Sequence, residues 1–159
     1  MEIVVYESIF ENQVIDHILN IQQNEFNVPI SIEDQPDLNQ IETYYQTNKG
    51  NFWLALENKK VIGTIALLDI DYQNAVIRKM FVNRNFRGPK YRVGQLLMNM
   101  LLAHAKHNQI LKIYLGTTAK MFAAHRFYEK NGFLRINKTE LPLLFPLVQV
   151  DTVFYKLIL

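Results

Sequence analysis

Hydrophobic residues recur along this chain in two patterns, one typical of short strands and one typical of amphipathic helices. Strand-like runs rich in β-branched and aromatic residues occupy residues 3–6, 52–57, 60–70, 75–82, 111–115, 133–137 and 152–158. Helical spacing begins at Val14, is clearest from Val93 onward and returns over residues 119–130. Turn-sized gaps separate the second, third and fourth runs, so we expect an antiparallel meander there.

This order of elements predicts a single α/β (α+β) domain over residues 1–159, with a mixed, mostly antiparallel sheet of about six to seven strands flanked by about four helices. A chain of 159 residues can bury a full core without disulfides or metals. It contains no cysteine, which excludes a disulfide framework, a thiolate zinc site and a cysteine nucleophile, and we expect no bound metal. The N-terminus carries glutamates where a signal peptide would be basic, and no apolar run approaches the roughly 18 residues of a membrane span. We therefore expect a soluble, cytoplasmic protein with no membrane partner.

Charge is strongly segregated along the chain, although the net charge is only +2. Residues 1–47 hold nine acidic residues and no lysine or arginine. Residues 78–92 hold six basic residues and no acidic one. A charge run can be no more than a solvated surface, but this separation indicates two ligands of opposite charge.

The basic segment runs directly into the clearest predicted helix. The first amide hydrogens of a helix lack intrahelical partners, and the helix dipole favours an anion there. Gly94 would let a ligand approach the backbone closely, and Arg87, Lys90 and Arg92 surround it with positive charge. We expect phosphate at this position, although glycine near a helix start is also common in purely structural roles.

Residues 78–133 resemble the GNAT superfamily of acetyl-coenzyme A-dependent N-acetyltransferases, and the flanking elements follow the order of that fold. Residues 78–82, RKMFV, are similar to its fourth strand, and FRGPKYRVGQLL at 86–97 resembles its pyrophosphate loop. The more specific likeness is AAHRFYEKNGF at 123–133, which matches the family's A-x-x-x-Y-x-x-x-G-F pattern. The resemblance implies acetyl-CoA as cosubstrate, held by Met80, Phe81, Val82, Arg87, Gly88, Lys90, Tyr91, Arg92, Val93, Gly94 and Gln95.

The chain departs from the family pattern in the loop and in the second helix. With the loop motif registered on Gly94, its first two marked positions are Pro89 and Arg92, so only the last position fits. The loop is also about two residues longer than usual in the family. Met121 stands where many members have an asparagine.

Tyr128 resembles the family's general acid, which would protonate the departing thiolate; the alternative is a tyrosine packed in the core. No general base stands out, because residues 75–82 contain no carboxylate. A water chain, His125 or an acid from another element remain open, and we interpret His125 as a satisfied or exposed helix residue.

The acidic N-terminal segment would wall the acceptor side of the resembling fold. Its connection at residues 27–38 contains two prolines and is expected to be irregular. We expect Glu33, Asp34 and Asp37 to bind the acceptor and to favour a cationic amine, unless they form only an exposed loop.

The function that we predict is direct acetyl transfer from acetyl-CoA to a primary amine of a small molecule or peptide. The alternative is a noncatalytic acyl-CoA-binding sensor or scaffold. Nucleic-acid binding through residues 78–92 is not expected, because no helix-turn-helix pattern or stacking aromatic residues accompany the basic residues. The final strand, residues 154–159, could support a homodimer.

Overall fold

The computed structural model describes all 159 residues and contains one seven-stranded sheet with the order β1-β2-β3-β4-β5-β7-β6. The strands are β1 (Glu2–Val5), β2 (Asn51–Glu57), β3 (Lys60–Asp69), β4 (Asn74–Val82), β5 (Lys112–Thr117), β6 (Leu134–Ile136) and β7 (Val153–Ile158). Strands β1 to β4 pair antiparallel, β4 pairs parallel with β5, and β7 pairs antiparallel with both β5 and β6. The predicted fold class and the meander are therefore confirmed.

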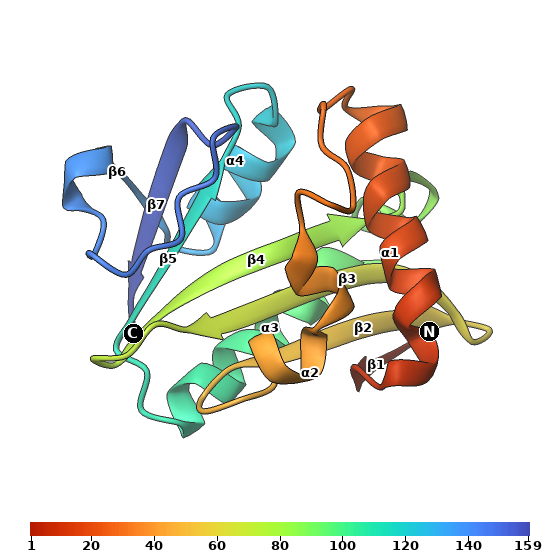
Figure 1. Cartoon of the computed structure of the whole chain (residues 1–159), viewed down its shortest axis with the longest axis horizontal. Coiled ribbons are helices and arrows are strands. Elements are labelled where there is room, and N and C mark those ends of the chain that lie inside the picture. The colour runs from red at the N-terminus through yellow and green to blue at the C-terminus, as the bar shows by residue number, and fades with distance from the viewer.

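Helices cover both faces of the sheet (Figure 1). On one face lie α1 (Glu11–Leu19), which continues as a π-helical segment (Asn20–Glu25), and the short α2 (Ile41–Tyr44). On the other face lie α3 (Val93–His107) and α4 (Phe122–Lys130). The helix predicted from residue 119 begins three residues later, because residues 118–121 form a turn before it.

Each face has its own hydrophobic core, as the periodicity of the sequence predicts. Leu97 and Leu101 of α3 are fully buried against the sheet, and Val14 and Ile18 of α1 are fully buried on the opposite side. Apolar residues spaced three and four apart form one stripe of a helix, so burying that stripe fixes the helix against the sheet. No helix in the structure has both the length and the apolar character needed to cross a bilayer.

Strands β4 and β5 stay paired over only three residue pairs, Asn74–Lys112, Ala75–Ile113 and Val76–Tyr114. Beyond Val76 the two strands diverge, as Figure 1 shows. The facing edges of β4 and β5 therefore have no strand partner in this region. Backbone polar groups on such edges need water or a ligand to complete their hydrogen bonds.

The final strand does not lie at an edge of the sheet. β7 has β5 on one side and β6 on the other. Because β6 pairs only with residues 154–156 of β7, a homodimer that uses residues 154–159 would have to form through a face of the strand or through its last residues, and it stays a prediction.

Candidate active site between β4 and β5

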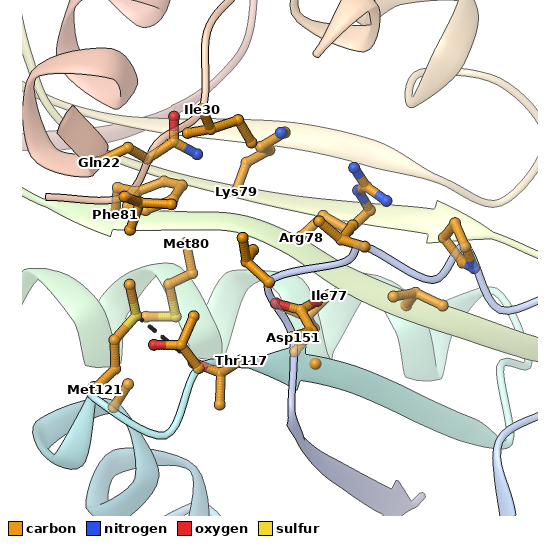
Figure 2. Close-up of a pocket in the computed structure, with 18 of the residues that line it drawn as sticks. Gln22, Ile30, Ile77, Arg78, Lys79, Met80, Phe81, Thr117, Met121 and Asp151 are labelled. Carbon is orange, nitrogen blue, oxygen red and sulfur yellow. Dashed lines mark hydrogen bonds between the residues drawn. The ribbon is translucent and has the colours of Figure 1, made fainter. Parts of the chain in front are cut away.

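A cavity of about 170 Å³ fills the divergence between β4 and β5. It is lined by β4, β5, the start of α4, the segment after α1 and the loop before β7. Figure 2 shows side chains from these separate parts of the chain around one space, with Lys79 and Gln22 on one side and Met121 and Thr117 on another. Five segments distant in sequence thus meet where the sheet opens.

A bulge in β4 gives this cavity its positive charge. Lys79 adopts a positive φ of 54°, and the register between β3 and β4 shifts between Thr64 and Ala66. The hydroxyl of Thr64 donates a hydrogen bond of 2.7 Å to the backbone oxygen of Lys79. Neighbouring residues of a regular strand point to opposite faces, but the bulge brings Arg78 and Lys79 to the same face.

The two cations share a single carboxylate. Asp37 Oδ2 lies 3.5 Å from Lys79 Nζ and 3.9 Å from an Arg78 nitrogen, and it accepts a 2.6 Å hydrogen bond from the Tyr45 hydroxyl. Lys79 also donates to Gln35 Oε1 at 2.6 Å, and Arg78 Nε donates to Tyr45 at 3.0 Å. Burial lowers the pKa of Lys79 to about 8, against the opposing effect of Asp37, so the ammonium is still mainly charged at neutral pH. The group therefore keeps one excess positive charge and several unused N–H donors.

Tyr128 presents a free hydroxyl to the cavity. The residue is only 7% exposed, and its ring packs against Phe133, Tyr155 and Phe127. Tyr128 lines the cavity, and its hydroxyl makes no hydrogen bond within the chain. Burial raises its pKa, and the negative charge of Asp151 raises it further. The phenol therefore stays protonated at neutral pH and can act as a proton donor.

Asp151, in the loop before β7, also lines the cavity, and unlike the exposed Asp34 it is partly buried. Burial raises its pKa to about 6, and the charges of Arg78 and Lys79 act in the opposite direction. Neither sequence periodicity nor the family resemblance singled out Asp151, Arg78 or Lys79. The signals in the sequence for Arg78 and Lys79 were their place in the basic segment 78–92 and their adjacency within an otherwise apolar strand.

The start of α3 has the geometry expected of an anion site. Arg92 precedes the helix with a φ of 54°, and its amide donates to the carbonyl of Gly88, whose φ is 97°. The amides of Val93, Gly94 and Gln95 are the helix's first and have no acceptor four residues earlier in the helix. A methyl group built on Gly94 would make only ordinary contacts, 3.5 Å from Met80 and 3.7 Å from Phe127. The packing of the fold therefore does not by itself require glycine at position 94.

The predicted cofactor residues are only partly brought together. Met80 and Phe81 line the cavity, whereas Val82 does not, and the carbonyl of Val82 accepts a 2.8 Å hydrogen bond from Arg87. Arg87 is also paired with the carboxylate of Glu25. A phosphate would therefore have to compete with Glu25 for this guanidinium. Lys90 instead lies over the ring of Tyr91, 5.1 Å from its centre.

The three predicted acceptor residues do not form one anionic site. Asp37 is buried beside Arg78 and Lys79, so its charge is already compensated. Asp34 lines the cavity, but its carboxylate accepts two 3.0 Å hydrogen bonds from Ser31. Glu33 is exposed and does not line the cavity.

His125 has a structural partner. Its Nε2 lies 2.8 Å from the carbonyl oxygen of Thr118, which ties the start of α4 to the preceding turn. This agrees with the interpretation of His125 as a satisfied helix residue.

Comparison with known proteins identifies the family. The sequence model of the acetyltransferase (GNAT) family matches residues 15–133. A GNAT-family acetyltransferase from Staphylococcus aureus MU50 is 39% identical, with a TM-score of 0.94, and the match covers 98% of this chain and 96% of that one. An acetyltransferase from Streptococcus agalactiae 2603 is 38% identical, with a TM-score of 0.95 and coverage of 99% and 98%.

A curated relative extends the comparison to a named enzyme. The N-acetylaspartate synthetase of Xenopus tropicalis is 37% identical over 106 residues, which are 65% of this chain and 38% of that protein. The chain therefore spans little more than a third of that relative. The family match over most of the chain and the two full-length structural matches show that this chain belongs to the acetyltransferase (GNAT) family.

Proposed function

We propose that this protein transfers an acetyl group from acetyl-CoA directly to the amine of a small acceptor that carries carboxylate groups. The observation that carries the proposal is the divergence of β4 and β5, which leaves a strand edge open beside the start of α3 and the free hydroxyl of Tyr128. Acetyl-CoA supplies a thioester carbonyl for attack by the amine. The chain's own residues hold the reactants, exclude water and supply a proton.

Each part of the site matches a part of the cosubstrate. The first amides of α3 and the basic residues around them suit a diphosphate. The unpaired edge of β4 suits the amide groups of pantetheine, which can pair with it as another strand would. Tyr128, in the last turn of α4, lines the cavity and would donate its phenolic proton to the departing sulfur. No cysteine is present to form an acyl-enzyme, so attack within a ternary complex is the route that we propose.

The acceptor is proposed from the cations on β4. Arg78 and Lys79 share one carboxylate and retain donors that face the cavity, and guanidinium and ammonium groups are strong partners for carboxylates. The name of the Xenopus relative points to the same chemistry, because aspartate is an amine with two carboxylates. We therefore propose an amino dicarboxylate, with L-aspartate as the first acceptor to test. The cationic acceptor expected from Glu33, Asp34 and Asp37 is the competing outcome.

An acetyl-transfer assay on a panel of amines tests this proposal. The panel contains L-aspartate, L-glutamate, L-alanine and spermidine, and free coenzyme A is measured with a thiol reagent. The protein has no cysteine, so it contributes no thiol background. We expect the highest kcat/KM with an amino dicarboxylate. Preference for spermidine would contradict the proposed acceptor, and tight coenzyme A binding without turnover on an extended amine panel would favour the sensor alternative.

Replacing Lys79 with methionine is expected to raise the KM for L-aspartate about tenfold or more, because a hydrogen bond to a charged group contributes about 1.5–3 kcal/mol. The kcat should change less, since the ammonium binds the acceptor and not the reacting carbonyl. Steady-state kinetics measures both parameters. The matched control is Lys106→Met, at the exposed far end of α3, which should leave both unchanged. An unchanged KM in the Lys79 variant would remove this residue from the acceptor site.

Replacing Gly94 with valine is expected to weaken coenzyme A binding by about tenfold, or ~1.4 kcal/mol, because the side chain would occupy space beside the first amides of α3. Isothermal titration calorimetry measures this affinity. A Cβ at position 94 lies at ordinary contact distances from its nearest atoms, and urea denaturation checks that the valine variant keeps the fold. An unchanged affinity would place the diphosphate elsewhere.

A further inference from the structure

Asp151 is a carboxylate that the fold leaves without a partner. It lies in the loop directly before β7 and lines the cavity, yet its side chain takes part in no hydrogen bond or ion pair within the chain. The other acids near the cavity are engaged: Asp34 accepts from Ser31, and Asp37 pairs with the two cations of β4. A part-buried carboxylate without a partner is costly, so its presence in a cavity indicates a role toward a ligand.

The backbone of β5 is shaped to accept this carboxylate. A methyl group built on Gly116 would lie only 2.6 Å from Asp151 Oδ2, closer than atoms can approach. Gly116 is the second-last residue of β5, beyond the point where β5 separates from β4. The missing side chain at Gly116 therefore lets Asp151 reach into the divergence between the strands.

The groups that face Asp151 surround one small space. Arg78 and Lys79 approach from β4, and Tyr128 approaches from α4; each interacts electrostatically with Asp151. Figure 2 shows Asp151 beside Ile77 and Arg78 at the cavity, with Thr117 of β5 nearby. Two cations, a proton donor and a free carboxylate thus converge where an acceptor amine would have to meet the thioester.

We infer that Asp151 is the general base of the transfer, accepting a proton from the ammonium group of an acceptor whose carboxylates lie against Arg78 and Lys79. This inference rests on the proposed function. The arrangement separates the acceptor's opposite charges, with its ammonium at Asp151 and its carboxylates at the β4 cations. The imidazoles near the cavity are already engaged, His17 with the carbonyl of Phe81 and His125 with that of Thr118.

The protons balance in this assignment. The acceptor's ammonium group gives one proton to Asp151, and the neutral nitrogen then forms a bond to the thioester carbonyl carbon as the carbon–sulfur bond breaks. Tyr128 gives its phenolic proton to the sulfur, and a second proton from the nitrogen restores the phenol. The amide keeps the third proton, and Asp151 releases its proton to solvent.

The pKa of Asp151, raised by burial to about 6, suits this role. The carboxylate is deprotonated at neutral pH, yet it is more basic than an ordinary aspartate. The raised pKa also means that the charged form of Asp151 disfavours folding as the pH rises from about 4 through 6. Removing the charge should therefore not lower the stability at neutral pH.

Asp151→Asn tests the inference with acetyl-CoA and L-aspartate, or with the best acceptor of the panel if another amine reacts faster. We expect kcat/KM to fall about 100-fold near neutral pH. The difference in kcat/KM between the variant and the wild type should become smaller as the pH approaches the pKa of the free amine, because more of the acceptor then binds with its amine already neutral. The kcat/KM of the wild type should rise as the pH increases through about 6, where Asp151 loses its proton, and the variant should not show this rise. Asp71→Asn, in the exposed turn between β3 and β4, is the matched control and should keep the wild-type profile.

Two further measurements separate a base from a structural residue. Carbon-13 NMR of the aspartate carboxyls in the free protein should show one group, absent from Asp151→Asn, that titrates near pH 6. Urea denaturation should show that the variant is at least as stable as the wild type. An active variant with an unchanged pH profile would overturn the inference while leaving the proposed function intact. A wild type that acetylates no amine would instead overturn the proposed function, and the base assignment with it.

Discussion

Replacing Tyr128 with phenylalanine is expected to lower kcat about 100-fold, because the loss of a general acid typically costs a factor of that order. The ring would keep its packing against Phe133 and Tyr155, so only the hydroxyl is removed. The affinity for coenzyme A should stay within about twofold, since the thiolate needs the proton only as it departs. Steady-state kinetics and isothermal titration calorimetry measure the two quantities separately.

Tyr155→Phe is a matched control for this variant. Tyr155 belongs to the same aromatic cluster, but its hydroxyl donates a 2.6 Å hydrogen bond to Glu129 and the residue does not line the cavity. This variant should lose some stability, about 1 kcal/mol, and keep its kcat. Comparable turnover in Tyr128→Phe and the wild type would mean that water protonates the sulfur.

Replacing Asp37 with asparagine is expected to lower the free energy of unfolding by about 3 kcal/mol. Asp37 is 7% exposed and is the only carboxylate in an ion pair with Arg78 and Lys79, so its loss removes the direct counter-charge of two largely buried cations. Only Asp151, which makes no ion pair with either cation, would remain near them. The hydroxyl of Tyr45 would also lose its charged acceptor. Urea denaturation measures the change, and a fall in melting temperature of roughly 6–12 °C should accompany it.

Glu33→Gln provides the comparison for this experiment. Glu33 is exposed and takes part in no ion pair, so its replacement should change the stability by less than about 0.5 kcal/mol. The Asp37 variant also separates two interpretations of the acidic segment. Unchanged stability together with a higher KM for a cationic amine would support Asp37 as an acceptor ligand and contradict its role as a structural counter-ion.

The parts of the fold that depend on local pattern could be predicted from the sequence. The spacing of Leu97 and Leu101 predicted α3, and the short gaps between three apolar runs predicted the meander of β2, β3 and β4. These features follow from burying one face of each element, which depends on residues close together in the chain. The motif around Tyr128 likewise matched the helix that carries this residue, α4, and the strand that follows it, β6.

The charged side of the cavity could not be predicted in the same way. Strand periodicity places Arg78 and Lys79 on opposite faces, and only the bulge at Lys79 turns them to the same one. Their pairing with Asp37 joins segments about forty residues apart in the sequence. Acidic and basic residues that are separated along the chain therefore neutralise one another in the folded structure. Asp151 lies beyond an irregular crossover, where no periodic signal shows which way a side chain points.

A crystal structure of this protein with coenzyme A tests the central claim most directly. We predict the diphosphate at the first amides of α3, from Val93 to Gln95, the pantetheine along the open edge of β4, and the sulfur within hydrogen-bond distance of the Tyr128 hydroxyl. Coenzyme A bound at any other surface, with the space between β4 and β5 filled only by water, would contradict the account.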